Sequence, residues 1–307
     1  CVLAYLCLAS AKLSARFFCM APFFVSLALY FRRIFSQKTK KSLVVTARVK
    51  KLFITCFIIS LVISSATVFV FNTLLYFVAN RDFERAEIVF CSVIPAFTNK
   101  IVALAAYVNA PFAKVRNARY VNKAKEKLRL TKSVIKIGIT GSYGKTSVKN
   151  ILYTILSEKY KVLATPESYN TPMGIAKTVE KLDSSYDIFI AEMGARKKGD
   201  IKELCEIVPL DYAILSGITE QHIETFGDIN EIKKEKTEIL RTLKSGAAVV
   251  SADCPYTATL DEGCVDENVK FIKAGIDMKF SPTVTCENIR VDEDGSEFTL
   301  VINGEKA

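Results

Sequence analysis

The sequence predicts two parts: an α-helical transmembrane region, followed by an α/β domain whose mostly parallel sheet is flanked by helices and ends in a β-rich tail. Residues 1–132 carry 21 basic and 4 acidic side chains, whereas residues 133–307 carry 21 basic and 28 acidic ones. A run of 29 residues without charge lies inside the first part, and β-branched runs alternate with helical periodicity in the second. This asymmetry indicates a membrane or a polyanion as partner of the basic part. An apolar fraction of 50% excludes intrinsic disorder.

Residues 1–113 are predicted to form a transmembrane region of two to three helices. The uncharged run at 52–80 is longer than the roughly 20 residues that cross a bilayer. Residues 88–113, interrupted by Lys100, and the short run 17–31 are weaker candidates. For these two, a buried helix of a soluble domain is the alternative interpretation.

The charged loops predict the orientation of these segments. Residues 32–51 carry eight basic side chains and no acidic one, and residues 114–132 are again strongly basic. The positive-inside rule places both in the cytoplasm, so we expect a multi-pass protein whose C-terminal domain is cytoplasmic. Residues 114–132 are predicted to be a basic juxtamembrane linker that contacts anionic lipid headgroups, and nucleic-acid binding is the less favoured alternative.

The nine cysteines are scattered and form no C-x-x-C pair, which argues against a zinc ribbon and favours free thiols. Residues 133–307 have the alternation of an α/β domain, and a hairpin signal, Asp294-Gly295, lies near the end. The expected strands are 134–140, 161–164, 187–191, 212–216 and 247–251, with the hairpin strands at 288–291 and 297–302. The expected helices are 145–157, 174–182, 200–207 and 228–243.

The strongest motif directly follows the first of these strands and opens a helix, as in P-loop-type domains. It is a shortened phosphate-binding loop, G-x-x-G-K-T-S, formed by Gly141, Ser142, Tyr143, Gly144, Lys145, Thr146 and Ser147. Glycines let backbone N–H groups approach phosphate oxygens, a lysine reaches the outer phosphates and a threonine hydroxyl holds Mg²⁺. The motif therefore predicts a site for phosphate groups and Mg²⁺, against the alternative of a plain glycine-rich turn.

Further candidates follow later strands, and each has an ordinary structural alternative. Glu192 ends a strand, where a carboxylate can bind Mg²⁺ or face solvent. His222 is the only histidine, and a lone histidine is often structural. Lys236 lies in a highly charged helical run that also fits a solvated face. Asn170 and Thr171 lie in a loop that is equally consistent with a plain turn.

Taken together, these blocks resemble the ATP-binding central domain of the Mur ligases, most closely the type that joins a muramoyl tripeptide to D-alanyl-D-alanine. The resemblance runs from about Val134 to the end of the chain. It implies an ATP-dependent ligase of peptidoglycan precursor synthesis that activates a muramoyl-peptide carboxylate as an acyl phosphate for attack by an amine. This would place the protein at the bacterial cytoplasmic membrane.

The resemblance also implies roles for individual residues. Residues 141–147 would cradle the phosphates, Thr146 and Glu192 would bind one Mg²⁺, and His222 would bind a second. Lys236 would be carbamoylated and, with Lys145 and His222, catalytic. Asn170 and Thr171 would help to seat the acceptor substrate.

Two departures from the family pattern limit these expectations. Membrane segments stand where the family has its UDP-binding domain, and the chain ends at Ala307, before the family's C-terminal domain. We therefore expect a fragment that is truncated at both ends and inactive alone. The alternatives are a ligase of the same superfamily, such as a folylpolyglutamate or cyanophycin synthetase, or a membrane P-loop protein that binds ATP without ligase activity.

Overall fold

The computed structural model describes residues 46–60, 62–63, 98–167, 169–221, 223–293 and 295–306. The chain divides into two units, residues 1–115 and 116–307.

The described part of the first unit consists of helical segments. Residues 47–60 and 62–63 are helical, and the helix α4 (Thr98–Leu130) begins in this unit. The Asn109 side-chain amide donates a hydrogen bond of 2.9 Å to the Thr55 hydroxyl and joins the two segments. Within the described ranges, no helix is both long and apolar enough to cross a membrane. Residues 17–31, 64–80 and 88–97 lie outside those ranges.

The second unit begins with the C-terminal part of α4. Residues 114–132, predicted as a linker, are helical as far as Leu130. Ala124 and Leu128 are buried against the core of the unit, and Val121 packs beside them. This spacing of three and four residues places all three side chains on one face of the helix. The Lys127 ammonium donates to the Glu180 carbonyl over 3.0 Å and fixes the end of α4.

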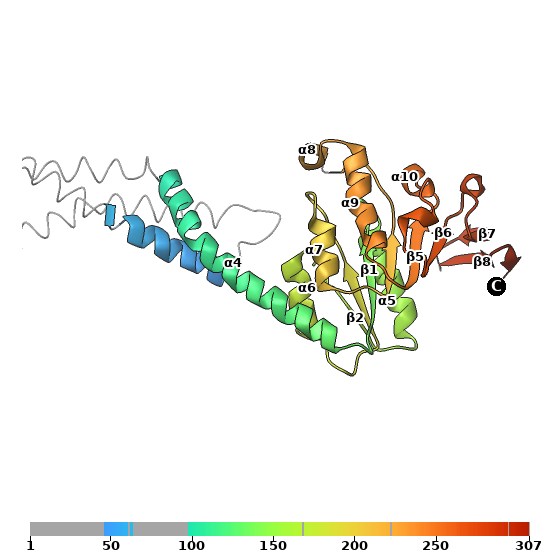
Figure 1. Cartoon of the computed structure of the whole chain (residues 1–307), viewed down its shortest axis with the longest axis horizontal. Coiled ribbons are helices and arrows are strands. Elements are labelled where there is room, and N and C mark those ends of the chain that lie inside the picture. The colour runs from blue at the N-terminus through green and yellow to red at the C-terminus, as the bar shows by residue number, and fades with distance from the viewer. Residues whose placement is uncertain are drawn as a thin grey trace, which may run out of the picture. The chain divides into compact units, whose positions relative to one another are not determined.

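A sheet of nine described strands forms the centre of the second unit (Figure 1). Its order is β2-β3-β1-β4-β5-β6-β7-β8-β9, parallel as far as β7 and antiparallel beyond it. The strands are β1 (Ile135–Thr140), β2 (Val162–Ala164), β3 (Ile188–Glu192), β4 (Tyr212–Leu215), β5 (Gly246–Ser251), β6 (Val269–Ala274), β7 (Val284–Val291), β8 (Ser296–Ile302) and β9 (Glu305–Lys306). The predicted class, a large and mostly parallel α/β sheet, is confirmed.

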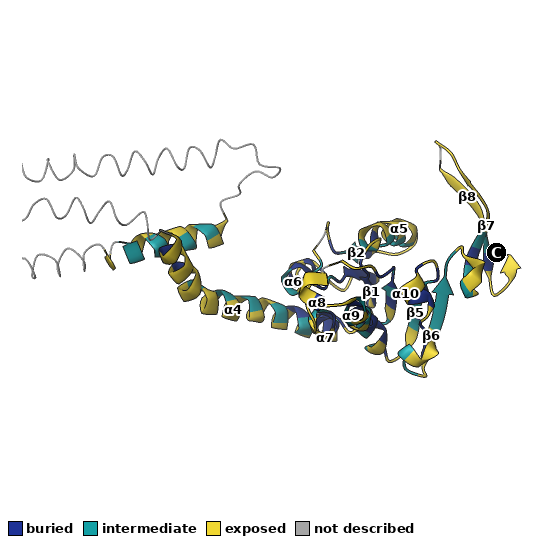
Figure 2. Cartoon of the chain, turned by 90° about the horizontal axis from the view of Figure 1, so that it is seen from above, coloured by how far each residue is buried: buried dark blue, intermediate teal, exposed yellow. Residues whose placement is uncertain are grey.

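Helices cover both faces of this sheet (Figure 2). The helices are α5 (Lys145–Ser157), α6 (Pro172–Val179), α7 (Asp200–Ile207), α8 (Ile223–Phe226), α9 (Ile229–Arg241) and α10 (Pro255–Ala258), with two short 3₁₀ turns, η2 (Glu262–Cys264) and η3 (Met278–Phe280). The helix α5 packs on one face over Ile139 and Ile190, whereas α6, α7 and α9 pack on the other over Phe189 and Ala191. Successive side chains of a strand point to opposite faces, which explains this division.

The predicted hairpin is present and extends the same sheet. The strands β7 and β8 pair in antiparallel fashion, and the Gly295 N–H donates to the Asp292 carboxylate over 3.0 Å at the turn. A bulge between Glu287 and Arg290 interrupts the register.

The helices that follow β1 and its two neighbouring strands lie on opposite faces of the sheet. The helix that follows β1 lies on one face of the sheet, whereas the helices that follow its neighbours β3 and β4 lie on the other. In open α/β sheets a ligand-binding crevice forms at such a point. We therefore expect a binding site at the loop that begins at Gly141.

Candidate nucleotide and metal site

The loop between β1 and α5 needs glycine at two positions. Gly141 and Gly144 have φ values of +153° and +75°, which other residues rarely adopt. A Cβ atom at Gly141 would also lie 2.1 Å from the Ser216 hydroxyl oxygen. Because the N-cap residue Gly144 has no side chain to cap α5, the first N–H groups of the helix remain available to an anion.

The loop after β4 holds this phosphate-type loop in place. The Ser142 N–H donates to the Gly217 carbonyl over 2.7 Å, and the Ser142 hydroxyl exchanges hydrogen bonds with the backbone of Thr219 at 3.0 and 3.2 Å. The Tyr143 ring lies on Gly217, where an added Cβ would be 2.5 Å from the ring carbon Cζ. These contacts with the loop after β4 thus fix the conformation of the phosphate-type loop.

The Lys145 side chain folds back onto the same loop. Its Nζ donates to the carbonyls of Gly141 and Ser142 over 2.6 and 3.2 Å. Burial lowers the pKa of Lys145, and the nearby Glu192 carboxylate partly offsets that effect. A lysine held in this position can neutralise charge that develops on a bound phosphate.

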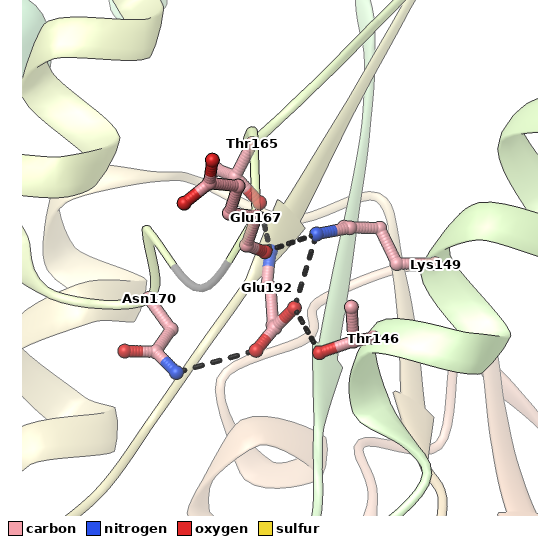
Figure 3. A network of polar contacts seen from close by, with 6 residues as sticks. All are labelled: Thr146, Lys149, Thr165, Glu167, Asn170 and Glu192. Atoms are coloured by element: carbon pink, nitrogen blue, oxygen red, sulfur yellow. Dashed lines mark hydrogen bonds and ion pairs between the residues drawn. The ribbon is translucent and has the colours of Figure 1, made fainter. Parts of the chain in front are cut away.

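Glu192, at the carboxyl end of β3, is the centre of a buried polar network (Figure 3). Only 1% of its surface is exposed. One carboxylate oxygen, Oε2, accepts hydrogen bonds from the Thr146 hydroxyl at 3.0 Å and from the Lys149 ammonium at 3.2 Å. The other oxygen, Oε1, accepts from the Asn170 amide at 3.2 Å. Two predicted metal-binding residues, Thr146 and Glu192, are therefore in direct contact.

The donor set fits Mg²⁺ that is shared with a nucleotide. A hydroxyl and a carboxylate are hard oxygen ligands, and Mg²⁺ usually takes one or two carboxylates together with phosphate oxygens. Within the described ranges, no three His, Cys, Asp or Glu side chains gather as a metal site. His222, the predicted ligand of a second ion, lies outside those ranges.

Lys149 was not predicted from the sequence. It lies one helical turn after Lys145 on α5, and its Nζ also donates to the Glu167 carbonyl over 2.5 Å. The sequence does contain a signal for the burial of Lys149, because its helical position lies beside the apolar face formed by Val148, Leu152 and Leu156.

Lys236 lies on the buried face of α9, with 3% of its surface exposed. Burial, reinforced by the nearby Lys145 ammonium, lowers the pKa of Lys236 to about 8. No hydrogen bond or ion pair joins its amine to a described residue. The alternative of a fully solvated helix face is therefore wrong at this position. The amine of Lys236 also interacts electrostatically with Lys145 of the phosphate-type loop.

Glu235 has a different role from its neighbour Lys236 and was also missed from the sequence. Its carboxylate accepts hydrogen bonds from the N–H groups of Gly199 and Ile201 over 2.7 and 2.8 Å. These groups lie at the N-terminus of α7, where a negative charge is favourable. Glu235 thus caps α7 and fixes α9 against it, which positions Lys236.

The two predicted acceptor residues make structural contacts. Asn170 bonds to Glu192 through its side chain, and its carbonyl accepts from the Gly194 N–H over 2.9 Å. The Thr171 hydroxyl accepts from the Gly174 N–H over 3.3 Å and caps α6. Their role in substrate binding stays a prediction. Ser147, the last residue of the motif, lies exposed in the first turn of α5.

Comparison with known proteins points to one family. The Mur ligase middle domain matches residues 139–307. The UDP-N-acetylmuramoyl-tripeptide--D-alanyl-D-alanine ligase of Mycobacterium leprae is 33% identical over 147 residues, which are 48% of this chain and 28% of that protein. The Escherichia coli protein of the same name is 31% identical over 170 residues, 53% of this chain and 36% of that protein.

A solved structure agrees with this similarity. The MurF ligase of Thermotoga maritima in complex with ADP is 29% identical, with a TM-score of 0.54 over 62% of this chain and 43% of that one. The chain thus spans about a third of the length of these two curated relatives and less than half of this solved one.

Proposed function

The chain belongs to the Mur ligase middle-domain family, and on this premise we propose that it supplies the ATP-binding part of a ligase of peptidoglycan precursor synthesis. One observation carries the proposal: the phosphate-type loop, the Thr146–Glu192 pair and the buried Lys236 meet at the carboxyl end of the sheet. The curated relatives, named as ligases of a UDP-N-acetylmuramoyl tripeptide and D-alanyl-D-alanine, support it.

The proposed reaction has two steps. The γ-phosphate of ATP passes to a carboxylate of the muramoyl peptide and gives an acyl phosphate and ADP. The amine of D-alanyl-D-alanine, or of a similar compound, then attacks the acyl carbon, the amide bond forms and phosphate leaves. Catalysis of phosphoryl transfer consists mainly of positioning and charge neutralisation.

The chain's own residues account for the first step. The free N–H groups at the start of α5 bind phosphate oxygens, and the Lys145 ammonium neutralises the charge that develops on them. Thr146 and Glu192 would hold Mg²⁺, which supplies a further positive charge to the phosphates. Each of these groups lies at the end of a buried strand or in the first turn of a helix, and is therefore held rigidly.

Lys236 is the residue proposed to be carbamoylated. With a pKa of about 8, roughly a tenth of its amine is uncharged at pH 7, far more than for an ordinary lysine. The uncharged nitrogen attacks CO₂, an N–C bond forms and the amine loses a proton. The product carries a negative charge near Lys145, where it relieves the repulsion between the two lysines. We propose that Asn170 and Thr171 lie beside the acceptor and that His222 binds a second Mg²⁺.

The experiment is ADP release by the natural protein with UDP-muramoyl tripeptide and D-alanyl-D-alanine, with the products identified by mass. A pentapeptide product is expected, and Lys145→Ala should abolish it. Release of ADP only with another acid and amine would place the protein with the other ligases of the superfamily. ATP turnover that depends on neither substrate would refute a ligase.

We also propose that residues 1–113 attach the protein to the bacterial cytoplasmic membrane, with the α/β unit in the cytoplasm. The support comes from the sequence: the 29-residue uncharged run and the basic loops at 32–51 and 114–132. The protein should stay with the membranes after extraction at alkaline pH. Its release into the supernatant would contradict the proposal.

A further inference from the structure

Lys149 and Glu192 form an ion pair in which both side chains are shielded from water. The Lys149 Nζ lies 3.2 Å from Glu192 Oε2, and the two side chains are 3% and 1% exposed. The Glu167 carbonyl accepts a second hydrogen bond from the same ammonium. Two contacts from two different segments hold the charge of Lys149 at one place (Figure 3).

The surroundings of Glu192 contain more positive than negative charge. Lys145 interacts electrostatically with Glu192, and Lys236 interacts with Lys145 in turn. The carboxylate of Glu235 is already bonded to the N-terminus of α7. A bare divalent cation at Glu192 therefore meets one carboxylate and the ammonium groups of Lys149 and Lys145, an arrangement that opposes its binding.

We propose that Lys149 is a positioning residue that makes divalent-metal binding at Glu192 conditional on the nucleotide. The inference rests on the proposed function, in which Glu192 is a ligand of Mg²⁺. Lys149 neutralises the carboxylate in the nucleotide-free protein, so the free ion gains little there. A metal ion that arrives with a nucleotide polyphosphate brings its own negative charge and is not repelled.

The geometry separates this role from a purely structural ion pair. Glu192 Oε2 bonds to Lys149 and to Thr146 at once, so the counter-charge acts on the oxygen that faces the other proposed ligand. A structural pair would contribute stability alone. A counter-charge at this atom must in addition change the affinity for the metal, because metal affinity depends on the net charge of the ligands.

The test measures Mn²⁺ binding by electron paramagnetic resonance in the full chain, without nucleotide and in buffer freed of CO₂, so that Lys236 remains an amine. Lys149→Met should bind Mn²⁺ about tenfold more tightly than the wild type, because one nearby positive charge is gone. Lys149→Arg keeps the charge and should behave as the wild type. The double variant Lys149→Met with Glu192→Gln, which lacks both charges, should show no gain.

Lys149→Gln serves if the methionine variant does not fold, because its amide is polar and carries no charge. Equal Mn²⁺ affinity in the wild type and in the uncharged variants would overturn the inference. Binding of Mn²⁺ in the presence of ADP tests the proposed function separately, since Glu192→Gln should weaken it. If Glu192→Gln leaves that binding unchanged, Glu192 is not a ligand and the metal site itself is wrong.

Discussion

Replacement of Lys236 by methionine should stabilise the α/β unit at neutral pH. Lys236 is 3% exposed as a residue, and no ion pair with a described residue compensates the burial of its side chain. Methionine has a similar length and no charge, so the substitution keeps the packing of α9 and removes the desolvated group. Such a gain from removing a candidate catalytic residue is expected where a site keeps an unfavourable charge for its function.

The size of the effect follows from the pKa. The pKa of Lys236 falls from the usual 10.5 to about 8, through burial first and the Lys145 ammonium second. Between these values the unfolded chain binds more protons than the folded one, so stability rises with pH across that window. The penalty is fully present below pH 8 and is lost as the pH approaches 10.5. It amounts to about 3 kcal/mol at neutral pH.

The assay is urea unfolding followed by far-UV circular dichroism in CO₂-free buffer at several pH values from 7 to 10. Lys236→Met should be more stable than the wild type at pH 7, and the difference should shrink by ~2 kcal/mol at pH 10. Lys234→Met, on the exposed side of the same helix, is the matched control and should show no such trend. A difference that does not change with pH would refute the assignment of a depressed pKa to Lys236.

Three further substitutions test the site and its support. Lys145→Ala should lower ATP turnover at least about 100-fold with an unchanged circular dichroism spectrum, and near-normal turnover would contradict the phosphate-loop assignment. Glu235→Ala should cost about 2 kcal/mol in unfolding free energy, because two N–H groups at the start of α7 lose their acceptor, and an unchanged urea midpoint would argue against the cap. Leu128→Ala should cost about 3 kcal/mol in the same measurement, whereas Leu130→Ala, at an exposed position, should be close to neutral.

The α/β unit was largely predictable because its elements have strong local signals. The helices Lys145–Ser157 and Asp200–Ile207 begin and end at the predicted residues, and the predicted strands agree with β1 to β5 within one residue at each end. Glycines and buried β-branched runs mark those boundaries. The helix at 114–130 was missed because its buried face consists only of small or isolated side chains such as Ala124 and Leu128 among many basic residues.

Only those site residues that belong to a recognisable sequence motif or end a predicted strand could be predicted from the sequence. The loop glycines, Lys145, Thr146 and Glu192 could be identified because their chemistry depends on a fixed spacing or on the end of a strand. The roles of Lys149 and Glu235 depend on contacts between segments 43 and 36 residues apart in the sequence. The periodicity of α5 could have placed Lys149 on the apolar face of the helix, but it does not encode the partner of either side chain.

The contact between Tyr143 and Gly217 has an evolutionary consequence. The Tyr143 ring occupies the space that a side chain at position 217 would need. Homologues that keep an aromatic residue at the first position should therefore keep glycine at the second, whereas those with a small residue there are free to vary. A side chain at position 217 should therefore occur only in homologues that have lost the aromatic ring at position 143, whereas a smaller residue at position 143 should be compatible with glycine at position 217.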